Sequence, residues 1–206
     1  MTFARFISKQ LSNPSGIVGN LAAFLWNRRN ARLNDVAFDS LALNSTDRVL
    51  EVGFGGGYLL GRMSAVLTNG WLAGVDVSPA MITFCERRYH PLKQNGKLEL
   101  RCAQAESLPY PSAYFTKVCS VNSIFYWQNV QRALSEFERV LTRGGFLVIC
   151  FTCKESLENR NFAKHIALYE ADEIEQMAAS CGFQVSTERL FDRHRKFLCM
   201  TARKQS

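Results

Sequence analysis

Three glycines at alternate positions, Gly53, Gly55 and Gly57, directly follow the apolar segment 49–52. A glycine-rich turn lets the backbone approach a ligand closely, because glycine has no Cβ and readily adopts positive φ. The helical pattern that follows would present unpaired N–H groups and a partial positive charge to this turn. Asp76 ends the next apolar segment, about 20 residues further on, where nucleotide-binding folds place the carboxylate that binds ribose hydroxyls. This spacing predicts a site for an adenosine-containing cofactor.

The glycine pattern excludes two common nucleotide-binding motifs. The dinucleotide fingerprint Gly-x-Gly-x-x-Gly fails whether it starts at Gly53 or at Gly55, because Tyr58 and Leu60 occupy the third glycine positions. The phosphate-binding loop fails as well, because no Gly-Lys-Ser/Thr follows. The pattern that remains is Glu-x-Gly-x-Gly-x-Gly, which begins at Glu51.

This run resembles motif I of the class I S-adenosylmethionine-dependent methyltransferases, particularly the small-molecule type related to the menaquinone and ubiquinone biosynthesis methyltransferases. Four further segments resemble that family in the same order, namely 74–82, 103–110, 115–123 and 141–149. The resemblance implies S-adenosylmethionine as the cofactor, S-adenosylhomocysteine as the product, and a reaction that needs no metal. It also implies that the chain is an enzyme that methylates a small molecule.

The resemblance further implies a set of cofactor-binding residues. Asp76 would bind the ribose, and segment 103–110 would border the adenine. Gln104 departs from the family, which usually carries aspartate at this position. A Gln carbonyl can accept the same hydrogen bond from the adenine amino group, but it carries no charge. The implied set comprises Glu51, Gly53, Gly55, Gly57, Asp76, Val77, Met81, Gln104, Ala105, Glu106 and Asn122.

Candidate acceptor-binding residues come from three further regions. In related methyltransferases the N-terminal helices lie over the cofactor, so Asn27 and Asn30 are candidates, with exposed helix positions as the alternative. Trp127 follows the fourth predicted strand and could offer an aromatic face to a cationic or planar group, or it could be a core residue. Tyr169 lies in the connection after the fifth strand, which in this family often shapes the acceptor site.

Two side chains are candidates for a catalytic role. Methyl transfer requires an acceptor atom in line with the methyl–sulfur bond, and a base is needed only if the acceptor must lose a proton early. His165 is the histidine that falls near the predicted site, and histidine commonly acts as a base. Tyr126 is the second candidate. An exposed helical histidine and a core tyrosine are the structural alternatives.

Apolar segments alternate regularly with helical patterns from residue 47 onward. We predict strands at 48–52, 71–76, 97–102, 116–121, 145–151, 183–189 and 197–203, and helices at 57–68, 79–90, 129–142 and 170–181. Strands separated by helices predict a mostly parallel sheet with helices on both faces, a Rossmann-like α/β fold. The resemblance implies that the last strand is antiparallel. We expect a single domain over 1–206, with 1–35 as a helical lid and 36–206 as the cofactor-binding core.

Size and composition are those of one soluble globular domain. The chain has 206 residues, of which 47% are hydrophobic and 21% charged. We find neither an apolar run of membrane-spanning length nor a signal-peptide pattern, and we expect a cytoplasmic location. Seven cysteines are scattered, and Cys150-x-x-Cys153 alone has metal or redox spacing. No second pair completes a zinc site, so we expect no metal.

The net charge of +7 raises the question of an anionic partner. We expect no nucleic-acid partner, because the sequence lacks both an Asn/Asp-Pro-Pro-Tyr/Phe motif after strand 4 and a Pro-Cys pair. The apolar, basic N-terminus also suits transient docking on an anionic membrane. Three functions therefore stay open: methylation of a small molecule, methylation of a lipid or quinone at the membrane surface, and a non-catalytic cofactor-binding subunit. The sequence fixes neither the acceptor nor the oligomeric state.

Overall fold

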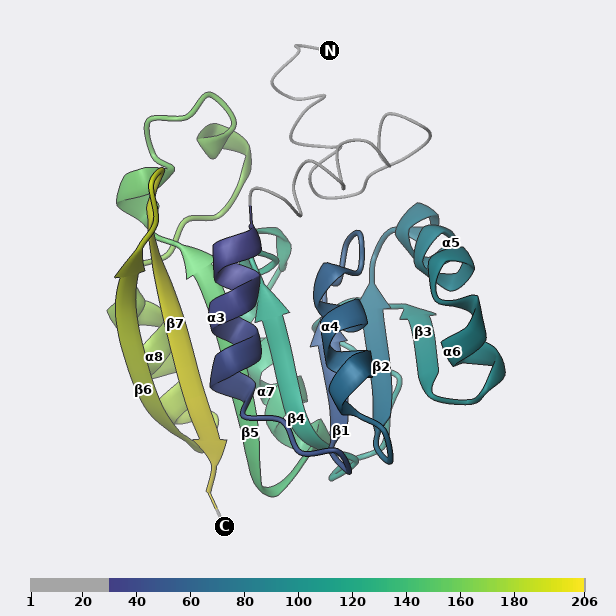
Figure 1. Cartoon of the computed structure of the whole chain (residues 1–206). Coiled ribbons are helices and arrows are strands. Elements are labelled where there is room, and N and C mark those ends of the chain that lie inside the picture. The colour runs from purple at the N-terminus through teal and green to yellow at the C-terminus, as the bar shows by residue number, and fades with distance from the viewer. Residues whose placement is uncertain (1–29, 206) are drawn as a thin grey trace.

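The computed structural model describes residues 30–205, and its elements are labelled as in Figure 1. The strands are β1 (Arg48–Val52), β2 (Trp71–Asp76), β3 (Leu98–Cys102), β4 (Phe115–Val121), β5 (Leu141–Thr152), β6 (Phe183–Phe191) and β7 (Lys196–Lys204). The helices are α3 (Ala31–Leu41), α4 (Tyr58–Val66), α5 (Pro79–Arg88), α6 (His90–Gln94), α7 (Val130–Val140) and α8 (Ala171–Ser180). Short 3-10 helices are η1 (Ile124–Tyr126), η2 (Lys154–Ser156) and η3 (Ala163–His165).

The strands form one sheet in the order β3-β2-β1-β4-β5-β7-β6. The first five strands in chain order pair in parallel, and β7 pairs antiparallel with both β5 and β6. The chain leaves β1 toward β2 and β3 and later returns to add β4 on the other side. This reversal puts a topological switch point between β1 and β4, where ligands bind in open α/β sheets. The predicted seven-stranded Rossmann-like fold and its antiparallel last strand are confirmed.

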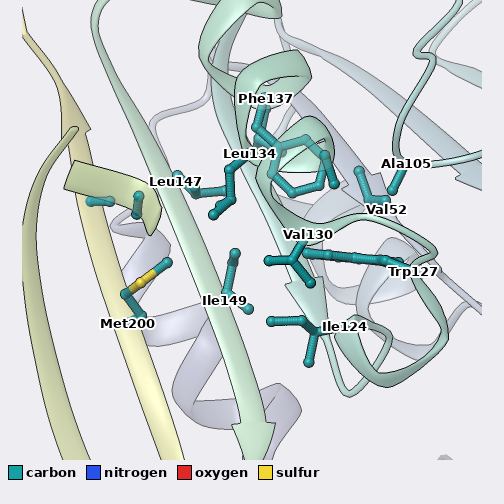
Figure 2. Packing of buried hydrophobic residues seen from close by; sticks show 14 of the residues in the cluster. Val52, Ala105, Ile124, Trp127, Val130, Leu134, Phe137, Leu147, Ile149 and Met200 are labelled. Atoms are coloured by element: carbon teal, nitrogen blue, oxygen red, sulfur yellow. The ribbon is translucent and has the colours of Figure 1, made fainter. Parts of the chain in front are cut away.

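Helices cover both faces of the sheet. Neighbouring residues of β1 point to opposite faces, so Val49 packs into the cluster under α3, α4 and α5, whereas Leu50 packs into the cluster under α7 and α8. Figure 1 shows α3 and α4 in front of the sheet and α7 behind it. Figure 2 shows the second cluster, in which Val130, Leu134 and Phe137 of α7 face the sheet. Because both faces are buried, the central strands are mainly apolar, and their buried polar residues include Glu51 of β1 and Ser120 of β4.

Most predicted element boundaries lie within one or two residues of the observed ones, and three of the differences are informative. The expected division between lid and core at 35/36 falls inside α3, whose residues Leu33, Ala37 and Leu41 are fully buried in the core. The helix predicted at 79–90 ends at Arg88, and α6 starts at His90 with Pro91 in its first turn, a favoured position for proline. Strand β5 begins at Leu141, before its glycine turn and not after it.

Candidate active site

The turn between β1 and α4 contains three glycines with positive φ, at 76° for Gly53, 50° for Gly55 and 72° for Gly57. A Cβ on Gly53 would lie 2.4 Å from the Cβ of Ser123, and one on Gly57 would lie 2.8 Å from the Cys85 sulfur. A Cβ on Gly55 would meet no heavy atom within 4 Å. Packing within the protein therefore accounts for two of the glycines, and only the middle one borders open space that a ligand could occupy.

The turn is fastened to α5 on its outer side. The Tyr89 hydroxyl, at the end of α5, donates a hydrogen bond to the Gly57 carbonyl at 2.7 Å. A Cβ on Gly61, one turn into α4, would lie 2.6 Å from the same hydroxyl. Gly61 is thus glycine because α4 and Tyr89 approach closely. The sequence pattern gave no sign of this contact, because Tyr89 lies far along the chain from both glycines.

Asp76 lies at the carboxyl end of β2, beside the turn, as predicted. Its side chain accepts hydrogen bonds from the backbone N–H of Gly55, at 2.9 Å, and from that of Ser78, also at 2.9 Å. Burial raises the pKa of this carboxyl despite these N–H donors, and the residue is only 8% exposed. Each carboxylate oxygen can accept a second hydrogen bond. The geometry is therefore compatible with the predicted contact to ribose hydroxyls.

Glu51 is buried beneath the same turn and is only 3% exposed. One of its carboxylate oxygens, Oε2, has no hydrogen-bond partner in the described structure. Burial is the largest cause of a pKa well above the ordinary value, the Asp76 charge adds to it, and the Leu60 N–H opposes it. A buried polar atom without a partner is costly, and it marks a place where a positively charged ligand would be stabilised.

The segment predicted to border the adenine divides into two parts. Gln104 is exposed, and Val77, at the end of β2, exposes 43% of its surface. Ala105 is buried. Glu106 is also buried, and its carboxylate accepts hydrogen bonds from the backbone N–H groups of Gln128 and Asn129, just before α7. Glu106 therefore holds the start of α7, a structural contact that the prediction of cofactor binding did not foresee.

Met81 also differs from its predicted role. Its side chain is fully buried in the cluster under α3, α4 and α5, so it offers no surface to a ligand. The residue that shapes this corner is Ser78, whose side chain accepts from the Met81 N–H at 3.4 Å and caps α5. Ser followed by proline is a recognised helix start. The Ser78-Pro79 pair in the sequence could have predicted this helix start.

Asn122 occupies the carboxyl end of β4 with a φ of 55°, an uncommon conformation for a residue other than glycine. Its amide nitrogen donates to Oδ1 of Asn30 at 2.9 Å, and its Oδ1 accepts from the backbone N–H of Thr152 at 2.9 Å. The guanidinium of Arg195 donates to the Thr152 hydroxyl at 3.3 Å. Asn122 and Asn30, predicted for cofactor and acceptor respectively, are thus linked to each other.

Trp127 is a core residue and not an acceptor-binding one. It is 9% exposed, its Nε1 donates to the Ser123 hydroxyl at 3.1 Å, and its ring packs edge-on against Phe137. Figure 2 shows Trp127 lying among core side chains, near Val130. Tyr126 is partly buried, and burial raises its pKa above the ordinary range. The phenol is therefore neutral near pH 7 and can donate a hydrogen bond, but it is poorly suited to act as a base.

Two further predicted residues, His165 and Tyr169, belong to the connection between β5 and α8. His165 is exposed in η3, and Tyr169 is half-buried just before α8. Burial raises the pKa of Tyr169, and the carboxylates of Glu173 and Glu106 add to the effect. The structure does not bring His165 to the glycine turn by any described contact. Asn27 lies outside the described residues.

The described residues contain neither a candidate metal site nor a membrane-spanning helix. No group of three or more His, Cys, Asp or Glu side chains is arranged to hold a metal ion within residues 30–205. Over that same stretch, every helix is too short or too polar to cross a bilayer.

A mostly parallel sheet with an antiparallel last strand and a glycine turn at its switch point defines a Rossmann-like methyltransferase. Comparison with known proteins agrees: a family model described as methyltransferase domain matches residues 50–149. The chain is 30% identical over 136 residues to the uncharacterized methyltransferase YdaC of Bacillus subtilis, covering 66% of this chain and 73% of YdaC. This chain therefore belongs to the methyltransferase family, and it is a class I S-adenosylmethionine-dependent enzyme.

The chain is also similar to a plant enzyme in sequence and to a solved structure in fold. The chain is 34% identical over 115 residues to the chloroplastic 2-methyl-6-phytyl-1,4-hydroquinone methyltransferase of Arabidopsis thaliana, covering 55% of this chain and 32% of that protein. This chain thus spans about a third of the plant enzyme. Geranyl diphosphate C-methyltransferase of Streptomyces coelicolor A3(2), solved with Mg²⁺, geranyl diphosphate and S-adenosyl-L-homocysteine, has the same fold with a TM-score of 0.74. Its sequence identity is 14%, with 95% of this chain and 87% of that chain covered.

Proposed function

We propose that this enzyme methylates a small-molecule acceptor that binds at the carboxyl ends of β4 and β5. One observation carries the proposal: the Gly55 N–H and the Asp76 carboxylate meet at 2.9 Å beside open space, with an unpaired oxygen of Glu51 buried beneath them. These groups suit a cofactor that carries both ribose hydroxyls and positive charge. The acceptor would then lie on the β4 side of the switch point, next to Asn122.

S-adenosylmethionine supplies an activated methyl group on a sulfonium centre. Asp76 would bind the ribose hydroxyls through the lone pairs that its two backbone donors leave free. The exposed side chain of Val77 would give the adenine an apolar contact, with the Gln104 carbonyl as an acceptor for the amino group. Glu51 would favour a cationic ligand, because a nearby positive charge compensates a buried carboxylate.

The chain's contribution at the acceptor side is mainly to position the reactants. Holding the reactants in line can lower a barrier by roughly 7–11 kcal/mol in favourable intramolecular cases, so a general base is not required for every acceptor. The Tyr126 phenol would donate a hydrogen bond to the acceptor, and burial, which raises its pKa, makes it still harder to deprotonate. We also propose that Asn30 borders the acceptor, since its Oδ1 accepts a hydrogen bond from the Asn122 amide nitrogen.

Calorimetry with S-adenosylmethionine and S-adenosylhomocysteine tests the cofactor site. Asp76→Ala should weaken cofactor binding at least tenfold, because it removes charge-assisted hydrogen bonds to the ribose and the brace on Gly55. Asp172→Ala, which alters an exposed carboxylate in α8, is the matched control and should leave the dissociation constant unchanged. Equal affinities for Asp76→Ala and the unaltered protein would show that the cofactor binds elsewhere.

A screen for the acceptor should use S-adenosylmethionine with a radiolabelled methyl group and cell extract separated into polar and lipid fractions. Label that enters a small molecule of the polar fraction, and is lost with Asp76→Ala, supports the proposal. Label that enters protein or nucleic acid instead would contradict it. The inactive variant controls for methylation by contaminating enzymes.

A second candidate acceptor is a hydroquinone or another lipid at the membrane surface. It is favoured by the identity to the plant enzyme, whose name gives a phytyl hydroquinone as its substrate. Two hydroquinones that share a ring but differ in tail length separate the candidates. If the long-tailed compound in vesicles is methylated and the tail-less compound is not, the acceptor is a membrane lipid.

A further inference from the structure

Phe191 is the most exposed large hydrophobic side chain of residues 30–205, with 82% of its surface accessible. The other exposed one, Val77, belongs to the cofactor site. Phe191 ends β6, and the cofactor site does not use it. An aromatic ring of this size is costly to leave in water, because aromatic side chains gain much from burial. Burial of this ring against a partner would therefore be favourable.

The turn that carries Phe191 is firmly held. Asp192 accepts hydrogen bonds from the backbone N–H groups of His194, at 2.8 Å, and Arg195, at 3.0 Å. The Lys196 N–H donates to the Ser156 hydroxyl at 2.9 Å, which fixes the hairpin to the connection that follows β5. Because the turn is tied to both its own strand and this connection, Phe191 is presented outward by an ordered backbone.

Basic side chains surround the exposed ring. Arg189 and Phe191 lie on one face of β6, since alternate residues share a face, and Lys196 is the cross-strand partner of Phe191. We call Arg189, Phe191, Arg193, His194 and Lys196 the hairpin-tip surface; all five are exposed. Segments 153–170 and 189–196 together hold seven Lys or Arg residues and four Asp or Glu residues, so this region is basic.

Salt bridges leave part of this charge unpaired. Lys196 pairs with Glu155 at 3.2 Å, and Arg195 turns inward to Asp192. Arg189 and Arg193, each two residues from Phe191 along the chain, are exposed and form no ion pair with the described residues. Figure 1 shows the β6–β7 turn at the same end of the sheet as the carboxyl ends of β1, β2 and β4. The hairpin-tip surface thus faces the same side as the active site.

We propose that the hairpin-tip surface docks on an anionic lipid bilayer, with Phe191 entering the interface and Arg189 and Arg193 facing lipid phosphates. An aromatic ring among basic side chains combines the two forces that hold peripheral proteins to such membranes, apolar burial and attraction to anionic lipid. Docking would bring the acceptor side of the enzyme close to the bilayer. The proposal concerns binding alone and does not depend on which molecule is methylated.

The test is co-sedimentation of the full chain, without cofactor, with vesicles of phosphatidylcholine alone or with added phosphatidylglycerol. Binding should require phosphatidylglycerol and decrease with added salt. Phe191→Ser should weaken it about tenfold through lost apolar burial, and Arg193→Glu should weaken it by about tenfold or more through charge reversal. Arg143→Glu makes the same charge change on an exposed residue at the opposite end of the sheet, and it should bind vesicles like the unaltered protein.

The variants must keep the same melting temperature and the same affinity for S-adenosylmethionine, which separates docking from folding and from the proposed activity. The proposal is overturned if the unaltered protein ignores anionic vesicles, or if Arg143→Glu weakens binding as much as Arg193→Glu does. It is also overturned if Phe191→Ser and Arg193→Glu reduce binding to single-stranded RNA but not to vesicles. That last outcome would identify a nucleic-acid surface.

Discussion

The cofactor side and the acceptor side of the site are built in different ways. On the cofactor side, a backbone N–H of the glycine turn and the Asp76 carboxylate come from adjacent strands, β1 and β2, separated by a single helix. On the proposed acceptor side, four distant segments supply Asn30, Asn122, Thr152 and Arg195, which are joined by hydrogen bonds of their side chains, one of them to the Thr152 backbone N–H. The residues of the proposed cofactor site are thus close together in the sequence, whereas those of the proposed acceptor site are far apart and are brought together only by folding.

The sharpest test of the cofactor side compares two glycines of the same turn. Gly53→Ala should lower the free energy of unfolding by about 3 kcal/mol, because its Cβ would overlap Ser123 in addition to the positive-φ penalty. Gly55→Ala should cost only about 1 kcal/mol, the positive-φ penalty alone, yet it should weaken cofactor binding because its Cβ enters the open space. Urea denaturation and calorimetry measure both quantities. Equal losses of stability for the two variants would show that Gly53 is not required by packing against Ser123.

The buried Glu51 gives the cofactor side a specific pH dependence. Since its folded-state pKa is raised, mainly by burial, the folded protein holds a proton that the unfolded chain has lost. Stability without cofactor should therefore fall as pH rises above the ordinary glutamate value toward the raised one. Glu51→Gln should reduce this decline, as read from melting temperature against pH, and leave the part that Asp76 contributes, since burial raises the pKa of that carboxyl as well.

Glu136 provides the control of opposite sign. Its hydrogen bond with Arg139 is the main reason that its pKa is lowered. The stability it contributes is present above the unfolded pKa and is lost as pH falls through the folded one. Glu136→Gln should thus flatten the acid side of the melting profile and leave the decline at higher pH intact. If both variants changed the melting temperature on the same side of the pH profile, the raised pKa of Glu51 would not be the cause of the decline at higher pH.

A smaller effect should follow from Asn122→Ala on the acceptor side. The variant leaves the buried Thr152 N–H without its acceptor, a loss of about 1–2 kcal/mol in unfolding free energy. The KM for the acceptor should rise, whereas the dissociation constant for S-adenosylmethionine should change little, because the Asn122 side chain bonds to the acceptor side. A large loss of cofactor affinity would instead place this side chain with the cofactor, as the family resemblance implied.

The smallest change is expected for Asn30→Ala, which removes one hydrogen bond at the start of α3. It should cost about 0.5–1.5 kcal/mol or less, since the Asn122 amide nitrogen can turn to water. If Asn30 borders the acceptor, the KM for the acceptor should nevertheless rise measurably. Steady-state kinetics on the acceptor found by the extract screen would measure this, and an unchanged KM would argue against a role for Asn30 at the acceptor.

The sequence predicted most of the fold because the strands are apolar runs with helical patterns between them. Each of the seven strands was placed, most within one or two residues, and β5 was the exception because its Gly144 turn lies inside the strand. Asp76 could be predicted from spacing alone. The roles of Trp127 and Glu106 could not, because side-chain direction at a strand end depends on neighbours from other segments. The exposure of Phe191 could not be predicted, because an aromatic residue in a strand pattern gives no indication of whether its side chain is exposed or buried.

The bond from the Tyr89 hydroxyl to the Gly57 carbonyl has a consequence for motion. It joins the residue that precedes α4 to the residue that follows α5, so the glycine turn and the end of α5 are constrained to move together. Amide hydrogens of both helices should consequently exchange with solvent at a common, slow rate, and replacing Tyr89 by phenylalanine should let one helix exchange before the other.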